Sequence, residues 1–198
     1  MIRYDNGDLE ALEQIYDVYC DAFPEEERKS IEHLKALLSR GQYRLILMLN
    51  QNELHQEDEI IVGFAFLYVS DVNQFSWLDY IVINPKIQSK GYGSKLLLYL
   101  KETYKLLIFE VEIPDGLDSN RERRIKYYEK LDAIRLNWEY YLPTPTGGLK
   151  MFLYALEDET SYPDDIIRAN MREALHYIHT DLSQLDEIIN QSKPNEHL

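Results

Sequence analysis

The stretch "NPKIQSKGYGSKLLLYL", residues 84–100, places two glycines between two apolar segments. The segment before it, 74–84, is apolar enough for a buried strand, and 93–104 has the spacing of an amphipathic helix. Glycine loses more backbone freedom on folding than other residues, so a glycine pair here indicates a structural need. We predict an anion site, because backbone N–H groups at a helix start carry partial positive charge. The alternative is a helix entry that only needs unusual backbone angles.

Two common phosphate-binding motifs do not fit the glycine pair. The P-loop pattern G-x-x-x-x-G-K-[ST] lacks its first glycine here. The dinucleotide fingerprint G-x-G-x-x-G finds Leu96 at its third glycine, where helix and strand must pack closely. We therefore reject both nucleotide folds and expect a pyrophosphate site with Gln88, Ser89 and Lys90 as additional donors.

The hydrophobic pattern predicts helices and strands in a mixed order. The expected helices are 8–23, 27–40, 93–104 and 119–131, and the expected strands are 43–50, 60–70, 74–84, 105–113, 133–143 and 149–157. An early antiparallel hairpin with one crossover helix is typical of an α+β fold. We predict a mixed, mostly antiparallel central sheet flanked by helices.

The composition changes near residue 157, where an acidic, turn-like segment begins. Beyond it, apolar residues recur every three to four positions and predict one long amphipathic helix: Ile167, Met171, Leu175, Ile178, Leu182, Leu185 and Ile189. We expect a domain at 1–156 and a C-terminal helical extension at 157–198. The extension is expected to pack on that domain or on a second subunit, in which case the protein is a homodimer.

The formal net charge of −14 bears on the partners. It argues against nucleic acid and an anionic membrane surface, and it suits a cationic small molecule or a basic peptide. Cys20 is the sole cysteine, and the N-terminus lacks the pattern of a signal peptide, so a cytoplasmic protein is expected. His176 and His179 stand one helical turn apart without further patterned ligands, so no metal is expected.

Gln88, Gly91 and Gly93 form the pattern Q-x-x-G-x-G, which resembles the [RQ]-x-x-G-x-[GA] loop of the GNAT (Gcn5-related) N-acetyltransferase family. "RRIKYYEKLDA", 123–133, is similar to the family's [FY]-Y-E-[KR]-x-G-F segment, and the order of elements agrees over roughly 1–156. The resemblance is to bacterial-type members. It implies the GNAT acyl-CoA acyltransferase fold, with acetyl-CoA as co-substrate and transfer of the acetyl group to a primary amine of a small molecule or peptide.

The resemblance also implies positions for the coenzyme. Backbone N–H groups near Val82 and Ile83 would polarise the thioester carbonyl and line the pantetheine channel. The pyrophosphate would lie on the glycine loop. The expected loop positions are Gln88, Ser89, Lys90, Gly91, Tyr92, Gly93 and Ser94.

By the same resemblance, Tyr128 is the general acid that protonates the departing thiolate, since a phenol is less acidic than a thiol. The alternative is a packed tyrosine with a structural role. Asp79 matches the family's common general-base position, and strand alternation would place it on one face with Ile81 and Ile83. Glu110 and Glu112 share a strand face and are expected to bind a cationic amine. The base is left open among these three carboxylates.

Two departures from the family pattern keep other functions in view. Asp132 and Ala133 replace the usual Gly-Phe, which favours a non-catalytic acyl-CoA-binding or sensing module as the alternative function. Asn120 lies one residue further from the tyrosine than the family's asparagine, so its role stays undecided. A third hypothesis places the function in the C-terminal helix, as an interaction surface.

Overall fold

The computed structural model describes residues 1–51, 59–72, 75–87, 91–104, 106–117, 119–156 and 163–195. The strands are β1 Ile2–Gly7, β2 Tyr43–Gln51, β3 Glu59–Val69, β4 Phe75–Ile83, β5 Leu106–Glu112, β6 Ile134–Arg135, β7 Trp138–Thr144, β8 Gly147–Leu156 and β9 Lys193–Pro194. The helices are α1 Leu9–Ala22, α2 Ile31–Ser39, α3 Tyr92–Thr103, α4 Ser119–Glu129, α5 Asp164–Ile178 and α6 Leu185–Gln191. The predicted α+β class is confirmed.

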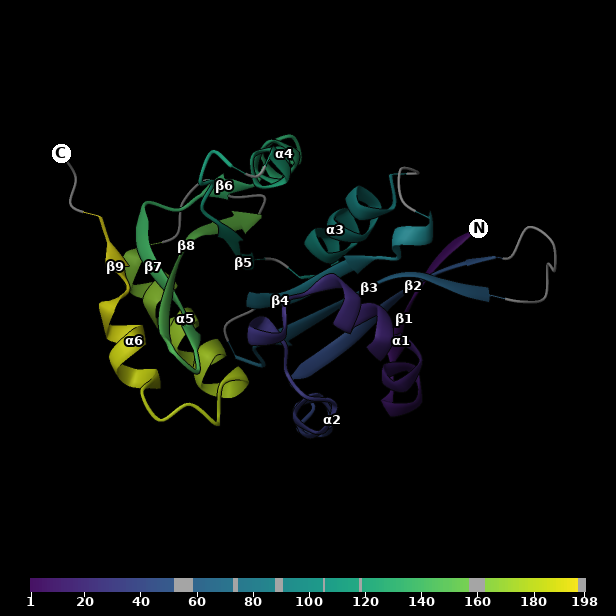
Figure 1. Ribbon diagram of the computed structural model, residues 1–198, viewed down its shortest axis with the longest axis horizontal. Helices are drawn as coiled ribbons and strands as arrows, with labels where there is room; N and C mark the ends of the chain where they lie inside the picture. Colours follow the sequence, from purple (N-terminus) through teal and green to yellow (C-terminus); the bar gives the residue numbers. More distant parts are fainter. Residues whose placement is uncertain are drawn as a thin grey trace.

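The strands form one sheet in the order β1-β2-β3-β4-β5-β8-β7-β9, with β6 paired to β8 (Figure 1). Side chains of α1, α2, α5 and α6 join one buried cluster on one face of the sheet. Side chains of α3 and α4 join a second cluster on the other face. The result is the three-layer arrangement expected when each helix buries an apolar stripe against a sheet.

Local sequence signals explain where the first two helices begin. The side chain of Asp8 accepts a hydrogen bond of 2.9 Å from the backbone of Ala11, and Ser30 accepts one of 3.2 Å from His33. Each is an N-cap that satisfies a backbone N–H lacking an intrahelical partner. The cap at Ser30 fixes the direction of the short segment between α1 and α2, which borders the main cavity.

The sheet divides between β4 and β5. These strands run parallel and pair only over Phe75–Leu78 against Leu106–Phe109. The remainder of each strand, 79–83 and 110–112, has no partner on the other, so the two halves of the sheet diverge (Figure 1). Unpaired strand edges leave backbone groups facing into the gap, where a ligand can reach them.

A β-bulge lies at the start of this gap. In the β3–β4 register, Phe66 pairs with Tyr80 and Leu67 with Leu78, so Asp79 is the extra residue. The predicted alternation of Asp79, Ile81 and Ile83 on one face is therefore wrong. Ile81 and Ile83 pack on the side of α3 and α4, whereas Asp79 bonds Tyr43 of the opposite cluster. A bulge redirects a side chain in this way, and simple alternation does not show it.

Two further predictions need correction. The strand β1 precedes the first helix and was missed, because Ile2 and Tyr4 are the only apolar residues in it. The single C-terminal helix is two helices, α5 and α6, separated by 179–184. Their apolar side chains share the core with α1 and α2, so the predicted stripe is buried within this chain. The turn of the predicted early hairpin, between the strands expected at 43–50 and 60–70, and the boundary at 157 lie largely outside the described residues.

Candidate active site

A cavity of about 800 Å³ occupies the gap between β4 and β5. Its walls come from segments far apart in the sequence: the end of α1 and the start of α2, residues 78–83 of β4, β5, α4, the β7–β8 turn, and residues 179–182 between α5 and α6. The predicted residues Asp79, Val82, Ile83, Glu110, Glu112 and Tyr128 all line it. The sheet division therefore brings most of the predicted site together.

The helix α3 begins beside one end of β4. Gly91 is its N-cap and has a φ of 72°, a conformation that is costly for residues with a Cβ. The N-cap provides no side-chain hydrogen bond, and a Cβ added at Gly91 would meet no atom of the described chain within 4 Å. The N–H groups of Tyr92, Gly93 and Ser94 stand in the first turn, where a helix leaves them without intrahelical partners. Gln88, Ser89 and Lys90 lie outside the described residues.

Gly93 has a different role from Gly91. A Cβ at Gly93 would lie 2.9 Å from the hydroxyl of Tyr127, so a larger residue here would have to push this side chain aside. Burial raises the pKa of Tyr127, and the neighbouring side chain of Ser94 partly offsets this rise. Tyr92 turns inward: its ring is buried and its hydroxyl accepts a hydrogen bond of 3.2 Å from Asn50. Tyr92 can therefore offer a ligand its backbone but not its ring.

Tyr128 lies on the α4 side of the cavity. Its ring is 4.9 Å from that of Phe109 and 6.4 Å from that of Tyr154, measured between centroids. Burial raises the pKa of Tyr128 to about 12, so the phenol keeps its proton at neutral pH. Within the described residues no hydrogen-bond partner is found for its hydroxyl, so its proton is available at the cavity wall.

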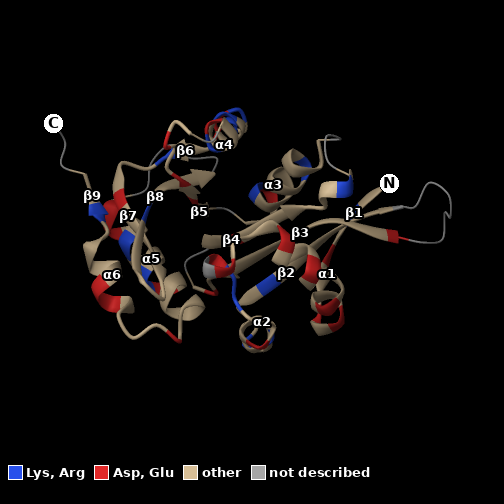
Figure 2. Ribbon diagram, in the orientation of Figure 1, with Lys and Arg blue, Asp and Glu red and all other residues tan. Residues whose placement is uncertain are grey.

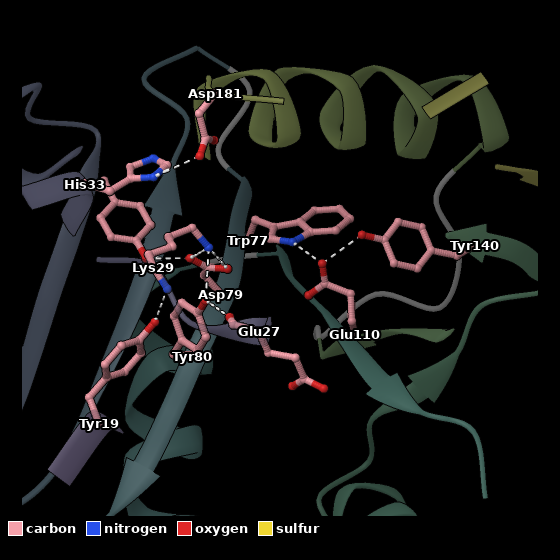
Figure 3. A network of polar contacts seen from close by, with 11 residues as sticks. Tyr19, Glu27, Lys29, His33, Trp77, Asp79, Tyr80, Glu110, Tyr140 and Asp181 are labelled. Atoms are coloured by element: carbon pink, nitrogen blue, oxygen red, sulfur yellow. Dashed lines mark hydrogen bonds and ion pairs between the residues drawn. The ribbon is translucent and has the colours of Figure 1, made fainter. Parts of the chain in front are cut away.

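Glu110 lies on β5 where that strand leaves β4. Its Oε1 accepts hydrogen bonds of 3.0 Å from Trp77 Nε1 and 2.8 Å from the hydroxyl of Tyr140 (Figure 3). Burial, and secondarily the charge of Asp79, raise the pKa of Glu110 to about 7. A carboxyl group with this pKa can accept and release a proton under neutral conditions.

Asp79 is held differently. Lys29 Nζ lies 2.9 Å from its Oδ2 and 3.1 Å from its Oδ1 (Figure 3). The Tyr43 hydroxyl donates a hydrogen bond of 2.5 Å to Oδ2. The side chains of Lys29 and Asp79 are each only 8% exposed. A buried pair of this kind is costly to break, because one charge would be left uncompensated. The carboxylate of Asp79 is therefore already bound by the ammonium group of Lys29 and the hydroxyl of Tyr43.

A family model for acetyltransferases, the acetyltransferase (GNAT) family, matches residues 12–133. The chain belongs to the GNAT family. The predicted family is thereby confirmed, and its match includes the divided strands, the α3 start and Tyr128.

Individual proteins are similar over more of the chain. "Putative acetyltransferase YjbC" of Bacillus subtilis is 28% identical over 168 residues, covering 83% of this chain and 81% of the relative. A solved structure, a "Putative acetyltransferase from GNAT family" of Bacteroides thetaiotaomicron, superposes with a TM-score of 0.71 at 22% identity, covering 88% of this chain and 96% of that one. Arabidopsis thaliana NAA60, solved in complex with acetyl-CoA, superposes with a TM-score of 0.59 at 12% identity, covering 79% and 98%.

The departure from the GNAT pattern at Asp132 leaves the turn intact. Asp132 has a φ of 62°, the left-handed conformation that a glycine adopts freely and that aspartate tolerates better than most residues. The backbone N–H of Ala133 donates a hydrogen bond of 3.1 Å to the carbonyl of Tyr128, which closes the end of α4. The substitution therefore preserves the position of Tyr128.

Glu112 does not face the GNAT cavity as a free carboxylate. It forms ion pairs of 3.1 Å with Arg121 and 2.8 Å with Arg124, both on α4. Figure 2 colours the basic positions of the ribbon blue, and several of them lie along α4. Two arginines compensate the charge of Glu112, so its predicted contact with a cationic amine has to compete with them.

Several residues at the site carry no sequence signal. Lys29, Trp77 and Tyr140 are bound to the predicted carboxylates but stand in segments that show only helix or strand patterns. His33 and Asp181 approach within 3.7 Å across the same cavity (Figure 3). An unusually buried lysine and tryptophan cannot be recognised before the fold brings their partners together.

Within the described ranges, no group of three or more histidine, cysteine or acidic side chains is arranged to hold a metal ion. In the same part of the chain, no helix is both long and apolar enough to cross a membrane.

Burial lowers the pKa of His179 well below its usual value, with smaller contributions from Lys29 and His33.

Proposed function

We propose that this protein is an acetyl-CoA-dependent N-acetyltransferase that acts on a primary amine of a small molecule or peptide. The observation that carries the proposal is the pairing, in one cavity of a GNAT protein, of a neutral phenol at Tyr128 with a carboxyl of pKa about 7 at Glu110. Acetyl transfer to an amine needs one group to give a proton and one to take it.

The coenzyme is assigned to the side of β4, α3 and α4. The first turn of α3 would receive the pyrophosphate, and the unpaired edge of β4 near Val82 and Ile83 would border the pantetheine and thioester. The Arabidopsis relative with acetyl-CoA bound supports this choice of acyl donor. Chemically, the coenzyme supplies a thioester whose carbonyl carbon is the electrophile.

The acceptor is assigned to the opposite side of the gap. There the cavity is bordered by the segment before α2, by Glu110, and by His179–Leu182. An amine arrives protonated at neutral pH and must lose a proton before it attacks. Glu110 takes that proton, because its pKa of about 7 suits a general base at neutral pH.

The chemical step exchanges one bond of the acetyl carbon for another. The neutral nitrogen attacks the thioester carbon, an N–C bond forms, and the C–S bond breaks. Tyr128 gives its proton to the departing thiolate and regains one from the acceptor nitrogen, which has to lose a second proton to become the amide. Glu110 then releases the first proton to solvent. Asp79 is assigned to the support of this site through Lys29 rather than to proton transfer, because both of its oxygens are occupied.

Other sequence-based alternatives have less support. The non-catalytic module was motivated by Asp132 and Ala133, and those residues keep the turn of the family. The homodimer was motivated by the C-terminal apolar stripe, and α5 buries that stripe within its own chain. A cytoplasmic location stays a prediction from the sequence.

The test is an acetyl-transfer assay with a panel of amines: spermidine, an aminoglycoside, and peptides with a free N-terminus or a lysine. We expect amine-dependent release of coenzyme A thiol with at least one class and a mass increase of one acetyl group in that amine. Binding of acetyl-CoA without any transfer across a broad panel would favour the acyl-CoA-binding module. Absence of acetyl-CoA binding in calorimetry would overturn the proposal altogether.

A further inference from the structure

The carboxylate of Glu110 is anchored through one oxygen. Trp77 Nε1 and the Tyr140 hydroxyl both donate to Oε1, at 3.0 and 2.8 Å, and no described side chain hydrogen-bonds Oε2. Figure 3 shows the two donors reaching Glu110 from separate strands, Trp77 from β4 and Tyr140 from β7. A carboxylate held by two donors on one oxygen cannot rotate without breaking both bonds.

The two donors are themselves immobile. The side chains of Trp77 and Tyr140 are both fully buried, and their ring centroids lie 6.0 Å apart. An indole has one N–H and a phenol one O–H, so each ring directs its only donor to Glu110. Burial raises the pKa of Tyr140 well above its usual value, which keeps that proton on the phenol. Such packing is the usual means of holding a catalytic group in one orientation.

The groups that surround Glu110 shift its pKa in opposite directions. Asp79 and the phenol of Tyr80, both on β4, lie close enough to interact with it electrostatically. Lys29, from the segment before α2, compensates Asp79. The negative charge of Asp79 favours the protonated form of Glu110, whereas the donors Trp77 and Tyr140 favour the carboxylate.

We propose that Trp77 and Tyr140 are positioning residues that fix the carboxylate of Glu110 through Oε1 and present Oε2 to the amine of the acceptor. The inference rests on the proposed role of Glu110 as the base. It adds that two aromatic side chains, from strands that flank the cavity, set the orientation and the basicity of Glu110. Neither side chain touches the reacting atoms.

Tyr140→Phe tests the inference with little change in shape. The hydrogen bond stabilises the charged carboxylate, so its loss should raise the pKa of Glu110 by about one unit. The pKa is measured by ¹³C NMR titration of the glutamate carboxyls, in which the Glu110 signal is assigned by its absence in Glu110→Gln. Tyr141→Phe is the matched control, because Tyr141 is the next residue of β7 and bonds Glu139 instead.

The kinetic arm uses the best acceptor from the amine panel. The acidic limb of kcat/KM should move upward by the same amount in Tyr140→Phe, because the base is then protonated up to a higher pH. Affinity for acetyl-CoA should not change, and thermal unfolding verifies that the variant folds. Trp77→Phe should shift the same limb in the same direction.

The variants distinguish the positioning role of Tyr140 from the role of Glu110 as the base. If Glu110→Gln is inactive but Tyr140→Phe leaves the pKa of Glu110 and the acidic limb unmoved, the positioning inference is overturned and the base assignment stands. If Glu110→Gln turns over like the parent, the base assignment fails and the inference with it. A shift in Tyr140→Phe that is absent in Tyr141→Phe supports the inference.

Discussion

The two sides of the cavity are built in different ways. The side assigned to the coenzyme consists of elements close together in the sequence, β4, α3 and α4, with only β5 between the two helices. It is assigned to bind through backbone groups and small residues such as Gly91 and Gly93. The acceptor side consists of side chains from distant segments, among them Lys29, Glu110 and Asp181. A site made of backbone serves one ligand common to a family, whereas a site made of side chains can change with each substrate.

The largest expected effect lies where the two sides meet. Tyr128→Phe removes the acid and keeps the ring, so kcat should fall about 10²-fold while the affinity for acetyl-CoA stays the same. Thiol release gives the rate, and calorimetry gives the affinity. Tyr154→Phe is the control, since its ring packs near Tyr128 without bordering the cavity. Equal rates in both variants would make Tyr128 a structural residue.

The coenzyme side can be probed through Gly93. Gly93→Ala should weaken acetyl-CoA binding about tenfold, because the new Cβ would lie 2.9 Å from the Tyr127 hydroxyl and displace the start of α3. Adding Tyr127→Phe should restore most of the affinity, since the nearest remaining atoms lie 3.7 Å away. Both are read by calorimetry. A double variant no better than Gly93→Ala would show that crowding by Tyr127 is not the cause.

On the acceptor side the expected effect is smaller and falls on a different ligand. Leu182→Ala removes apolar surface from the wall between α5 and α6, so KM for the acceptor should rise about threefold while affinity for acetyl-CoA is unchanged. Steady-state kinetics with the best amine measure it. Leu98→Ala, on the exposed side of α3, is the control. A change in acetyl-CoA affinity alone would contradict the division into two sides.

The smallest effect concerns the turn after α4. Asp132→Gly should raise the free energy of unfolding by about 0.5 kcal/mol, because relief of the Cβ penalty at the positive φ is partly offset by the greater freedom of glycine in the unfolded chain. Urea unfolding measures the change, and acetyl-CoA affinity should stay the same. A lower stability in Asp132→Gly would mean that the aspartate side chain makes a compensating contact.

The same contrast explains what the sequence can predict. The glycine loop, the α3 helix and the YYE segment are each contiguous, so their residues identify them in the sequence alone, and the order of most elements follows from periodicity. The face of Asp79 was mispredicted because a bulge adds one residue to β4. Trp77 and Tyr140 could not be assigned, because their relation to Glu110 exists only after several strands have paired.

The position of α5 and α6 determines when the core can close while the chain is being synthesised. These helices cover the face of the sheet that also receives α1 and α2, and they emerge from the ribosome after all the long strands. At about 5–20 residues per second, residues 163–195 take roughly two to seven seconds to make. During that interval apolar side chains such as Trp77, Tyr140 and Leu153 lack their final cover on the nascent chain. Slower translation prolongs this exposure. Because the core stays open until the last helices are made, coexpressed chaperones should improve the yield of folded protein. The improvement should be larger than for a chain whose core is closed by its first helices.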